Sequence, residues 1–169
     1  MNISDRLNNL ATFYHREAGK CVRGKAYLAA VVMQMAALEA ALQAMCFLYP
    51  GEIKKTDVYR KKKFRSKRNK ALDFSLNQLI NIADELSWFP KKRITWAGKR
   101  TSLAGFAHEI REIRNLVHPG KYALRKWYDM KFNKGTYEVT CEIFDVATSW
   151  LLHRVEQSLL KRVGREGRI

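Results

Sequence analysis

The chain has 169 residues, of which 47% are apolar and 11% aromatic, and this length suits a single domain, residues 1–169, with its own hydrophobic core. The formal net charge of +16 at pH 7 favours a polyanionic partner, nucleic acid above all. Three cysteines, Cys21, Cys46 and Cys141, are odd in number and far apart, which disfavours a disulfide framework and a zinc site. We therefore expect a cytoplasmic protein that uses no metal and no cofactor.

The N-terminal part of the chain predicts two helices. The first is expected to begin at Ser4, an N-cap candidate, and to run toward Glu17. The second is expected from about Lys25 to Phe47, because apolar residues recur there at steps of three and four. Polar residues interrupt this second helix, so we expect it to be buried in the core rather than to span a membrane. These interruptions are Gln34, Glu39 and Gln43.

The rest of the chain predicts further helices and no strand. The third helix is expected over residues 72–86, and the fourth from a cap at Thr101 or Ser102 to His118. The last helix is expected over 136–163. Its predicted core face is formed by Val139, Ile143, Val146, Trp150, Leu151, Val155 and Leu159. Together these elements predict an all-α fold, a helical bundle of four to five helices with a basic insertion between the second and third helices.

Positive charge is concentrated in three segments. Residues 54–70, the basic insertion, contain ten Lys or Arg and one Asp, a local net charge of +9. Residues 91–100 contain five basic residues and no acid, and residues 161–169 contain four basic residues and one Glu. The chain is therefore a nearly neutral body that carries basic segments.

The basic insertion lacks apolar periodicity, which is typical of a mobile loop or an exposed helical extension. Its cations suit contacts with phosphates, and the interleaved Tyr59 and Phe64 suit stacking on bases. A solvated loop without a ligand is the alternative, and a membrane surface is disfavoured because no amphipathic basic helix accompanies the charge. The predicted RNA-binding residues are Lys54, Lys55, Tyr59, Arg60, Lys61, Lys62, Lys63, Phe64, Arg65, Lys67, Arg68 and Lys70.

A second candidate site lies at the end of the fourth predicted helix. Arg114 and His118 are four residues apart, and Arg111 and His118 are seven apart, so all three project from one helix face. Pro119 disfavours helical dihedral angles at the preceding residue, which places His118 at the helix end. This arrangement could hold and cleave a phosphodiester. Alternatively, the histidine bonds a terminal carbonyl and Glu112 pairs with an arginine.

The bundle and this helix end resemble the HEPN superfamily (higher eukaryotes and prokaryotes nucleotide-binding domains), all-α domains that are often metal-independent endoribonucleases. The resemblance rests on the Ala-rich second helix, on Ile113–Gly120 and on the final amphipathic helix. It implies that an RNA 2′-hydroxyl attacks the adjacent phosphorus, with His118 as general acid or base. Arg114, with Arg111, would hold the phosphate, and Asn115 would orient the histidine or the phosphate.

In that family, an arginine followed by a polar residue precedes the histidine by four to six intervening positions. Arg114 is followed by Asn115, but only three residues separate it from His118. Six residues separate Arg111 from His118, but Glu112 follows it. Each arginine therefore meets one of the two conditions.

Glu39 lies within the otherwise apolar second helix. An acid buried there would need a cationic partner, such as an arginine of the motif. An acid at the solvent edge of the helix needs none, and we expect Glu39 to lie at this edge.

The sequence therefore predicts a HEPN-like metal-independent endoribonuclease that acts on RNA in a toxin–antitoxin or phage-defence system. The resemblance also implies a homodimer with a composite site, with an antitoxin or a defence complex as partner. The alternative is a non-catalytic HEPN-like RNA- or protein-binding module of a larger complex. A third hypothesis is a bundle that only mediates protein contacts.

Overall fold

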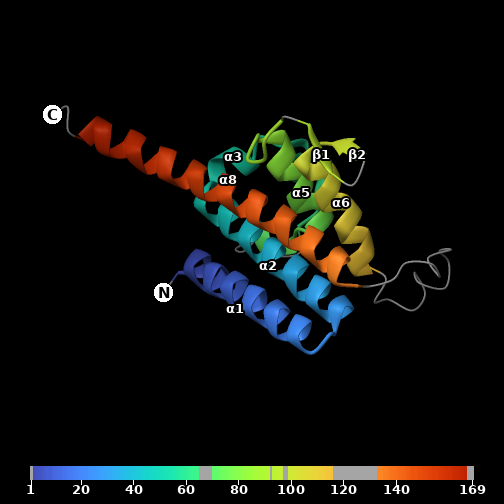
Figure 1. Cartoon of the computed structure of the whole chain (residues 1–169). Coiled ribbons are helices and arrows are strands. Elements are labelled where there is room, and N and C mark those ends of the chain that lie inside the picture. The colour runs from blue at the N-terminus through green and yellow to red at the C-terminus, as the bar shows by residue number, and fades with distance from the viewer. Residues whose placement is uncertain (1, 65–69, 92, 97–98, 116–132, 167–169) are drawn as a thin grey trace.

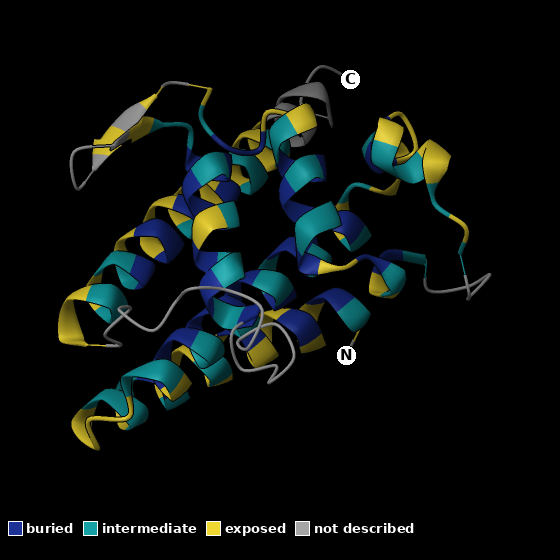
Figure 2. Ribbon diagram, turned by 90° about the vertical axis from the view of Figure 1, so that its right-hand side faces the viewer, coloured by how far each residue is buried: buried dark blue, intermediate teal, exposed yellow. Residues whose placement is uncertain are grey.

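The computed structural model describes residues 2–64, 70–91, 93–96, 99–115 and 133–166. It is an all-α bundle, which confirms the predicted fold class (Figure 1). The buried residues lie at the centre of the bundle and the exposed residues at its periphery (Figure 2). The predicted continuation of the fourth helix to His118 lies outside the described residues.

The first two helices form an antiparallel pair (Figure 1). Helix α1 spans Ile3–Arg23 and α2 spans Tyr27–Leu48. Asn2, not Ser4, caps α1, because its side chain accepts a hydrogen bond from the Asp5 backbone N–H at 2.8 Å. Ser4 lies inside the helix and is buried. The predicted start of α1 and its predicted end near Glu17 were therefore wrong, and the helix continues to Arg23.

Helix α2 is the centre of the core, in contact with α1, α5, α6 and α8. This position explains why apolar residues surround it rather than forming one stripe. Gln34 is fully buried, and its amide bonds the ring nitrogen Nδ1 of His15 on α1. By length and composition alone α2 could span a membrane, but a buried core helix meets the same criterion, and 56% of its most apolar window is buried inside the bundle.

Short helices lie before, within and after the described part of the basic insertion. Helix α3 spans Pro50–Ile53, α4 spans Asp57–Lys61 and a 3₁₀ turn spans Lys70–Asp73. Helix α5 follows over Leu76–Glu85, with Ser75 and Gln78 forming a capping box. The third helix therefore begins later than predicted, because Ser75 ends the incoming segment and supplies the cap.

A short β-hairpin, which the sequence analysis did not predict, precedes α6. Strands β1 (Ile94–Trp96) and β2 (Lys99–Thr101) are antiparallel. Helix α6 then spans Leu103–Arg114 and is capped by the side chain of Ser102, one of the two predicted caps. Strands this short leave no room for the alternation of apolar and polar residues that identifies longer ones.

Helix α8 spans Lys134–Glu166 and packs on α2 and α6. Its C-terminal part extends beyond the rest of the bundle (Figure 1). Val146, Trp150 and Leu159 are 38%, 45% and 54% exposed, so their predicted place in the core was wrong. Ile143 and Leu151 are buried, as predicted, and Ala147 is buried as well, so the face that α8 turns toward the core is narrower than predicted.

Candidate nucleic-acid interface

The motif arginines project from the last turns of α6. Asn115 caps this helix, and its backbone N–H bonds the carbonyl oxygens of Arg111 and Ile113. The Asn115 side chain is buried. Arg111 and Arg114 are each partly exposed. His118 lies outside the described residues, so the described part of the site consists of Arg111, Arg114 and Asn115.

Arg114 is paired with Glu39 of α2. Its Nη2 lies 3.4 Å from Glu39 Oε2, and both side chains are about one-quarter to one-third exposed. The pair joins the end of α6 to the middle of α2. The prediction that Glu39 marks the solvent edge without a partner was wrong, since the fold brings a motif arginine to it.

Arg111 is paired with its neighbour Glu112 through Nη2. Its Nε is buried without a hydrogen-bond partner among the described residues. Both motif arginines therefore contact carboxylates in this structure.

His108 lies near Arg111 on the same helix. Burial and the Arg111 charge lower the pKa of the His108 ring, which keeps that ring neutral at pH 7. Its Nε2 donates to Asn81 Oδ1 at 2.9 Å, so His108 has a structural partner.

Stability should depend on pH through Glu39. Burial raises the pKa of this carboxyl above its ordinary value of 4.5, and Arg114 opposes the shift only in part. Between the ordinary and the raised value the native state binds more protons than the unfolded chain, so the free energy of unfolding falls as pH rises through that window. Glu39→Gln cannot ionise and should escape this fall.

Urea unfolding of both proteins at about pH 4 and about pH 7 measures the effect. Glu39→Gln is expected to gain stability relative to the parent protein on going to the higher pH. If the free energies of unfolding of Glu39→Gln and the parent protein differ by the same amount at both pH values, the raised pKa of Glu39 is contradicted.

The described cations of the basic insertion include five exposed side chains. They are Lys54, Lys55, Arg60, Lys61 and Lys63. Lys62 is half-buried and donates to Gln78 Oε1 at 2.9 Å. The exposed side chains form the most accessible part of the predicted RNA-binding segment. Arg65, Lys67 and Arg68 lie outside the described residues.

Tyr59 and Phe64 belong to an aromatic cluster that also contains Phe74. The ring centroids of Tyr59 and Phe64 are 4.7 Å apart, and those of Phe64 and Phe74 are 5.5 Å apart. Lys70 Nζ lies 5.6 Å from the Tyr59 centroid and 5.1 Å from the Phe64 centroid. Stacking of either ring on a base would have to break these contacts, so the exposed cations are the better candidates for RNA contact.

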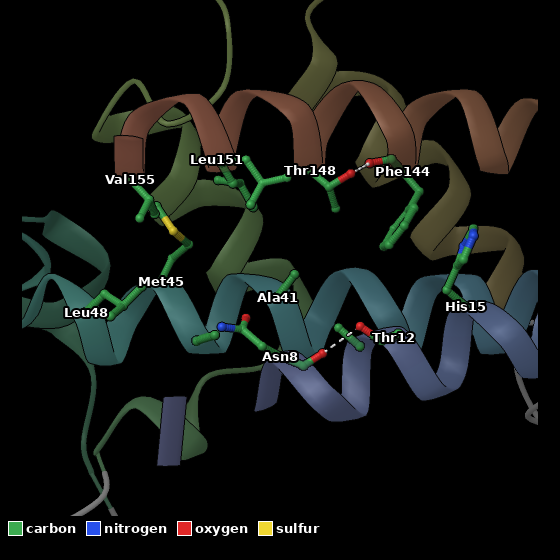
Figure 3. A pocket seen from close by; sticks show the side chains of 13 residues that line it. Asn8, Thr12, His15, Ala41, Met45, Leu48, Phe144, Thr148, Leu151 and Val155 are labelled. Carbon is green, nitrogen blue, oxygen red and sulfur yellow. Dashed lines mark hydrogen bonds between the residues drawn. The ribbon is translucent and has the colours of Figure 1, made fainter. Parts of the chain in front are cut away.

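A groove of about 460 Å³ runs between α1, α2 and α8 (Figure 3). Its wall is mostly apolar, with Met45 and Leu151 on opposite sides. The polar Thr12 donates to the Asn8 carbonyl within α1, and the His15 ring stacks on Phe144 at 5.1 Å. Since Thr12 and His15 already contact other groups of the protein, the groove is an apolar packing surface. It does not direct several polar side chains toward one ligand.

A second cleft, of about 440 Å³, was missed by sequence reasoning. Glu52 of α3, Trp88 after α5, and Trp150 and Arg154 of α8 line it. Sequence reasoning assigned Trp150 to the core and gave no role to the other three. No pattern in the sequence predicts that residues so far apart in the chain line one cleft. A tryptophan on an exposed helix face is nevertheless unusual.

The part of the chain that the structure describes contains no group of three or more His, Cys, Asp or Glu side chains placed to hold a metal ion. No protein-family model, no curated protein and no solved structure matches this chain. Membership of the HEPN superfamily therefore stays a prediction that rests on the residues themselves.

Proposed function

We propose that this protein is a HEPN-like RNA-binding protein that cleaves RNA without a metal ion. Its charge supports RNA binding: ten of its 32 basic residues fall within residues 54–70. Several of these side chains are exposed and grouped at one end of α2. Cations placed in this way displace counterions from a phosphate backbone, which drives binding without reading sequence.

The cleavage proposal rests on the end of α6. The 2′-hydroxyl of RNA would attack the adjacent phosphorus while the bond to the 5′-oxygen breaks. His118 would take the proton from the 2′-hydroxyl or give one to the departing 5′-oxygen. Arg114, partly exposed and four residues earlier, would stabilise the negative charge that builds on the phosphate. Arg111 and Asn115 would support this site.

The same proposal includes a homodimer in which two motif copies form one composite site. It places the protein in the cytoplasm, within a toxin–antitoxin or phage-defence system. An antitoxin or another protein of a defence complex would then be its protein partner. The family resemblance supports the dimer, the system and the protein partner, and the three separated cysteines support the cytoplasm.

A non-catalytic RNA- or protein-binding module is the second candidate. It is favoured by the ion pairs of Arg114 with Glu39 and of Arg111 with Glu112. An arginine held by a carboxylate must leave it, or share its donors, to bind a phosphate. The short spacing between Arg114 and His118 favours the same candidate.

Removing exposed charge from the basic insertion should weaken RNA binding. We expect the triple variant Lys55→Gln, Lys61→Gln, Lys63→Gln to lower affinity for single-stranded RNA about 50-fold at physiological salt, with a salt slope smaller by about 2. Each lost phosphate contact removes about 0.7 from that slope. Fluorescence anisotropy over a salt series measures both quantities.

A matched control removes three lysines from the opposite end of the bundle: Lys20, Lys25 and Lys134. All three side chains are exposed, and α2, about 33 Å long, separates Lys25 from Lys55. This control is expected to keep most of the affinity. Equal losses in the two triple variants would mean that net charge alone attracts RNA, and the absence of binding by the parent protein would reject the proposal.

A further inference from the structure

The cleft between α3, the turn after α5 and α8 is built around one carboxylate. Glu52 Oε2 accepts hydrogen bonds from Arg154 Nη2 at 2.7 Å and from Trp88 Nε1 at 3.2 Å. Glu52 Oε1 accepts none from the described residues, so an acceptor is available at the cleft. The Arg154 guanidinium also lies 5.6 Å from the Tyr49 ring centroid. These contacts hold the polar floor of the cleft in place.

Trp150 forms an open aromatic wall at the rim of this cleft. Its side chain lines the cleft, and the residue is nearly half exposed. The His153 ring meets it edge to face, with centroids 6.4 Å apart. Ser87, which also lines the cleft, adopts a left-handed backbone conformation with φ of 53°, which is strained for a residue with a side chain. An exposed indole beside polar groups is the arrangement on which bases stack.

Each element that lines the cleft continues directly into a basic segment. Glu52 is two residues before Lys54, where the basic insertion begins. Trp88 is three residues before Lys91, and Ser158 is three residues before Lys161. Three residues span at most about 11 Å, so all three basic segments start close to the cleft. The first residues of the basic segments therefore lie near this aromatic site, and Lys54 and Lys55, the first cations of the basic insertion, are exposed.

We propose that this cleft holds an unpaired nucleobase of single-stranded RNA, stacked on Trp150, while the exposed Lys54 and Lys55 contact the flanking phosphates. The inference rests on the proposed RNA binding and adds a base-holding site separate from the Arg114 helix end. The cleft volume of about 440 Å³ is large enough for one base. The free Glu52 oxygen accepts a hydrogen bond from an exocyclic amino group, such as the N4 amino group of cytosine.

The test separates the base from the phosphates. Two labelled oligonucleotides of equal length and charge, oligocytidine and a fully abasic strand, are titrated with the protein at physiological salt. The parent protein is expected to bind oligocytidine about tenfold more tightly, because stacking of one base contributes on this scale. Trp150→Ala is expected to bind both strands with equal affinity and an unchanged salt slope, since no charge is lost.

Two further variants control for the substitution itself. Trp150→Phe keeps an aromatic face and is expected to retain most of the preference for oligocytidine. Leu152→Ala truncates another exposed apolar side chain of α8 that lines the groove toward α1, and it is expected to behave as the parent protein. Thermal melts of all variants show whether each one is folded.

The outcomes separate the two proposals. Equal binding of both oligonucleotides by the parent protein overturns the base-holding cleft and leaves charge-driven RNA binding in place. A base preference that survives Trp150→Ala also overturns the cleft, since the base is then held elsewhere. Binding of neither strand rejects the proposed function, and the cleft inference falls with it.

Discussion

Replacement of Arg114 or His118 by alanine is expected to lower the rate of RNA cleavage by about 10²-fold or more, with cleavage by the parent protein unaffected by EDTA. Loss of His118 removes the group that would move a proton to or from the reacting oxygens. Loss of Arg114 removes the cation that would stabilise charge on the phosphate. Initial rates on a labelled single-stranded RNA, with and without EDTA, measure these effects.

The ion pair with Glu39 supplies the control for Arg114. Glu39→Gln removes the pair but keeps the arginine, so the guanidinium becomes free to bind phosphate. If Arg114 contacts the substrate, Glu39→Gln should cleave at least as fast as the parent protein while Arg114→Ala is inactive. If the pair only holds α6 to α2, both variants should lose activity and melting temperature together.

The parent protein decides whether the site is catalytic at all. RNA that stays intact after prolonged incubation with the pure protein, while binding is demonstrated, would contradict the ribonuclease proposal. It would favour the non-catalytic module. Activity that EDTA abolishes would contradict the metal-independent mechanism instead.

Trp88→Ala is expected to lower the free energy of unfolding by about 3–5 kcal/mol. Trp88 is only 1% exposed and belongs to the central hydrophobic core, so its removal leaves a large cavity. It also deprives Glu52 of the indole N–H donor. Urea denaturation of the purified variant, compared with the parent protein, measures the loss.

Two variants show where this stability comes from. Trp88→Phe keeps an aromatic ring in the core and loses the hydrogen bond, so a smaller loss than that of the alanine variant is expected. Trp150→Ala removes an exposed indole and is expected to change stability by less than about 1 kcal/mol. A loss for Trp88→Ala no greater than that for Trp150→Ala would contradict the assigned core.

The core face of α8 could be predicted from its sequence only in part: Ile143 and Leu151 are buried as predicted, but Val146 and Trp150 are exposed. Apolar residues occur on more than one side of this helix, so periodicity alone admits several faces. The structure buries Ile143, Ala147 and Leu151 and leaves Trp150 exposed. Which face is buried depends on where α2 lies, and that depends on the packing of the whole bundle.

The ends of the helices show a similar limit. The sequence offered Thr101 or Ser102 as the cap of α6, and the structure selects Ser102. At the N-terminus both Asn2 and Ser4 are good caps, and the sequence offers no means of ranking them. The structure selects Asn2 and buries Ser4 within the helix.

The sequence by itself determined the helical class of the protein, the central buried helix and the placement of positive charge along the chain. These properties follow from local periodicity and composition, which neighbouring residues carry among themselves. Only the tertiary structure decided that Glu39 meets Arg114, and that Glu52, Trp88 and Arg154 form one cluster. The physical reason is that such contacts join residues tens of positions apart, and close packing of the whole bundle decides which of them meet.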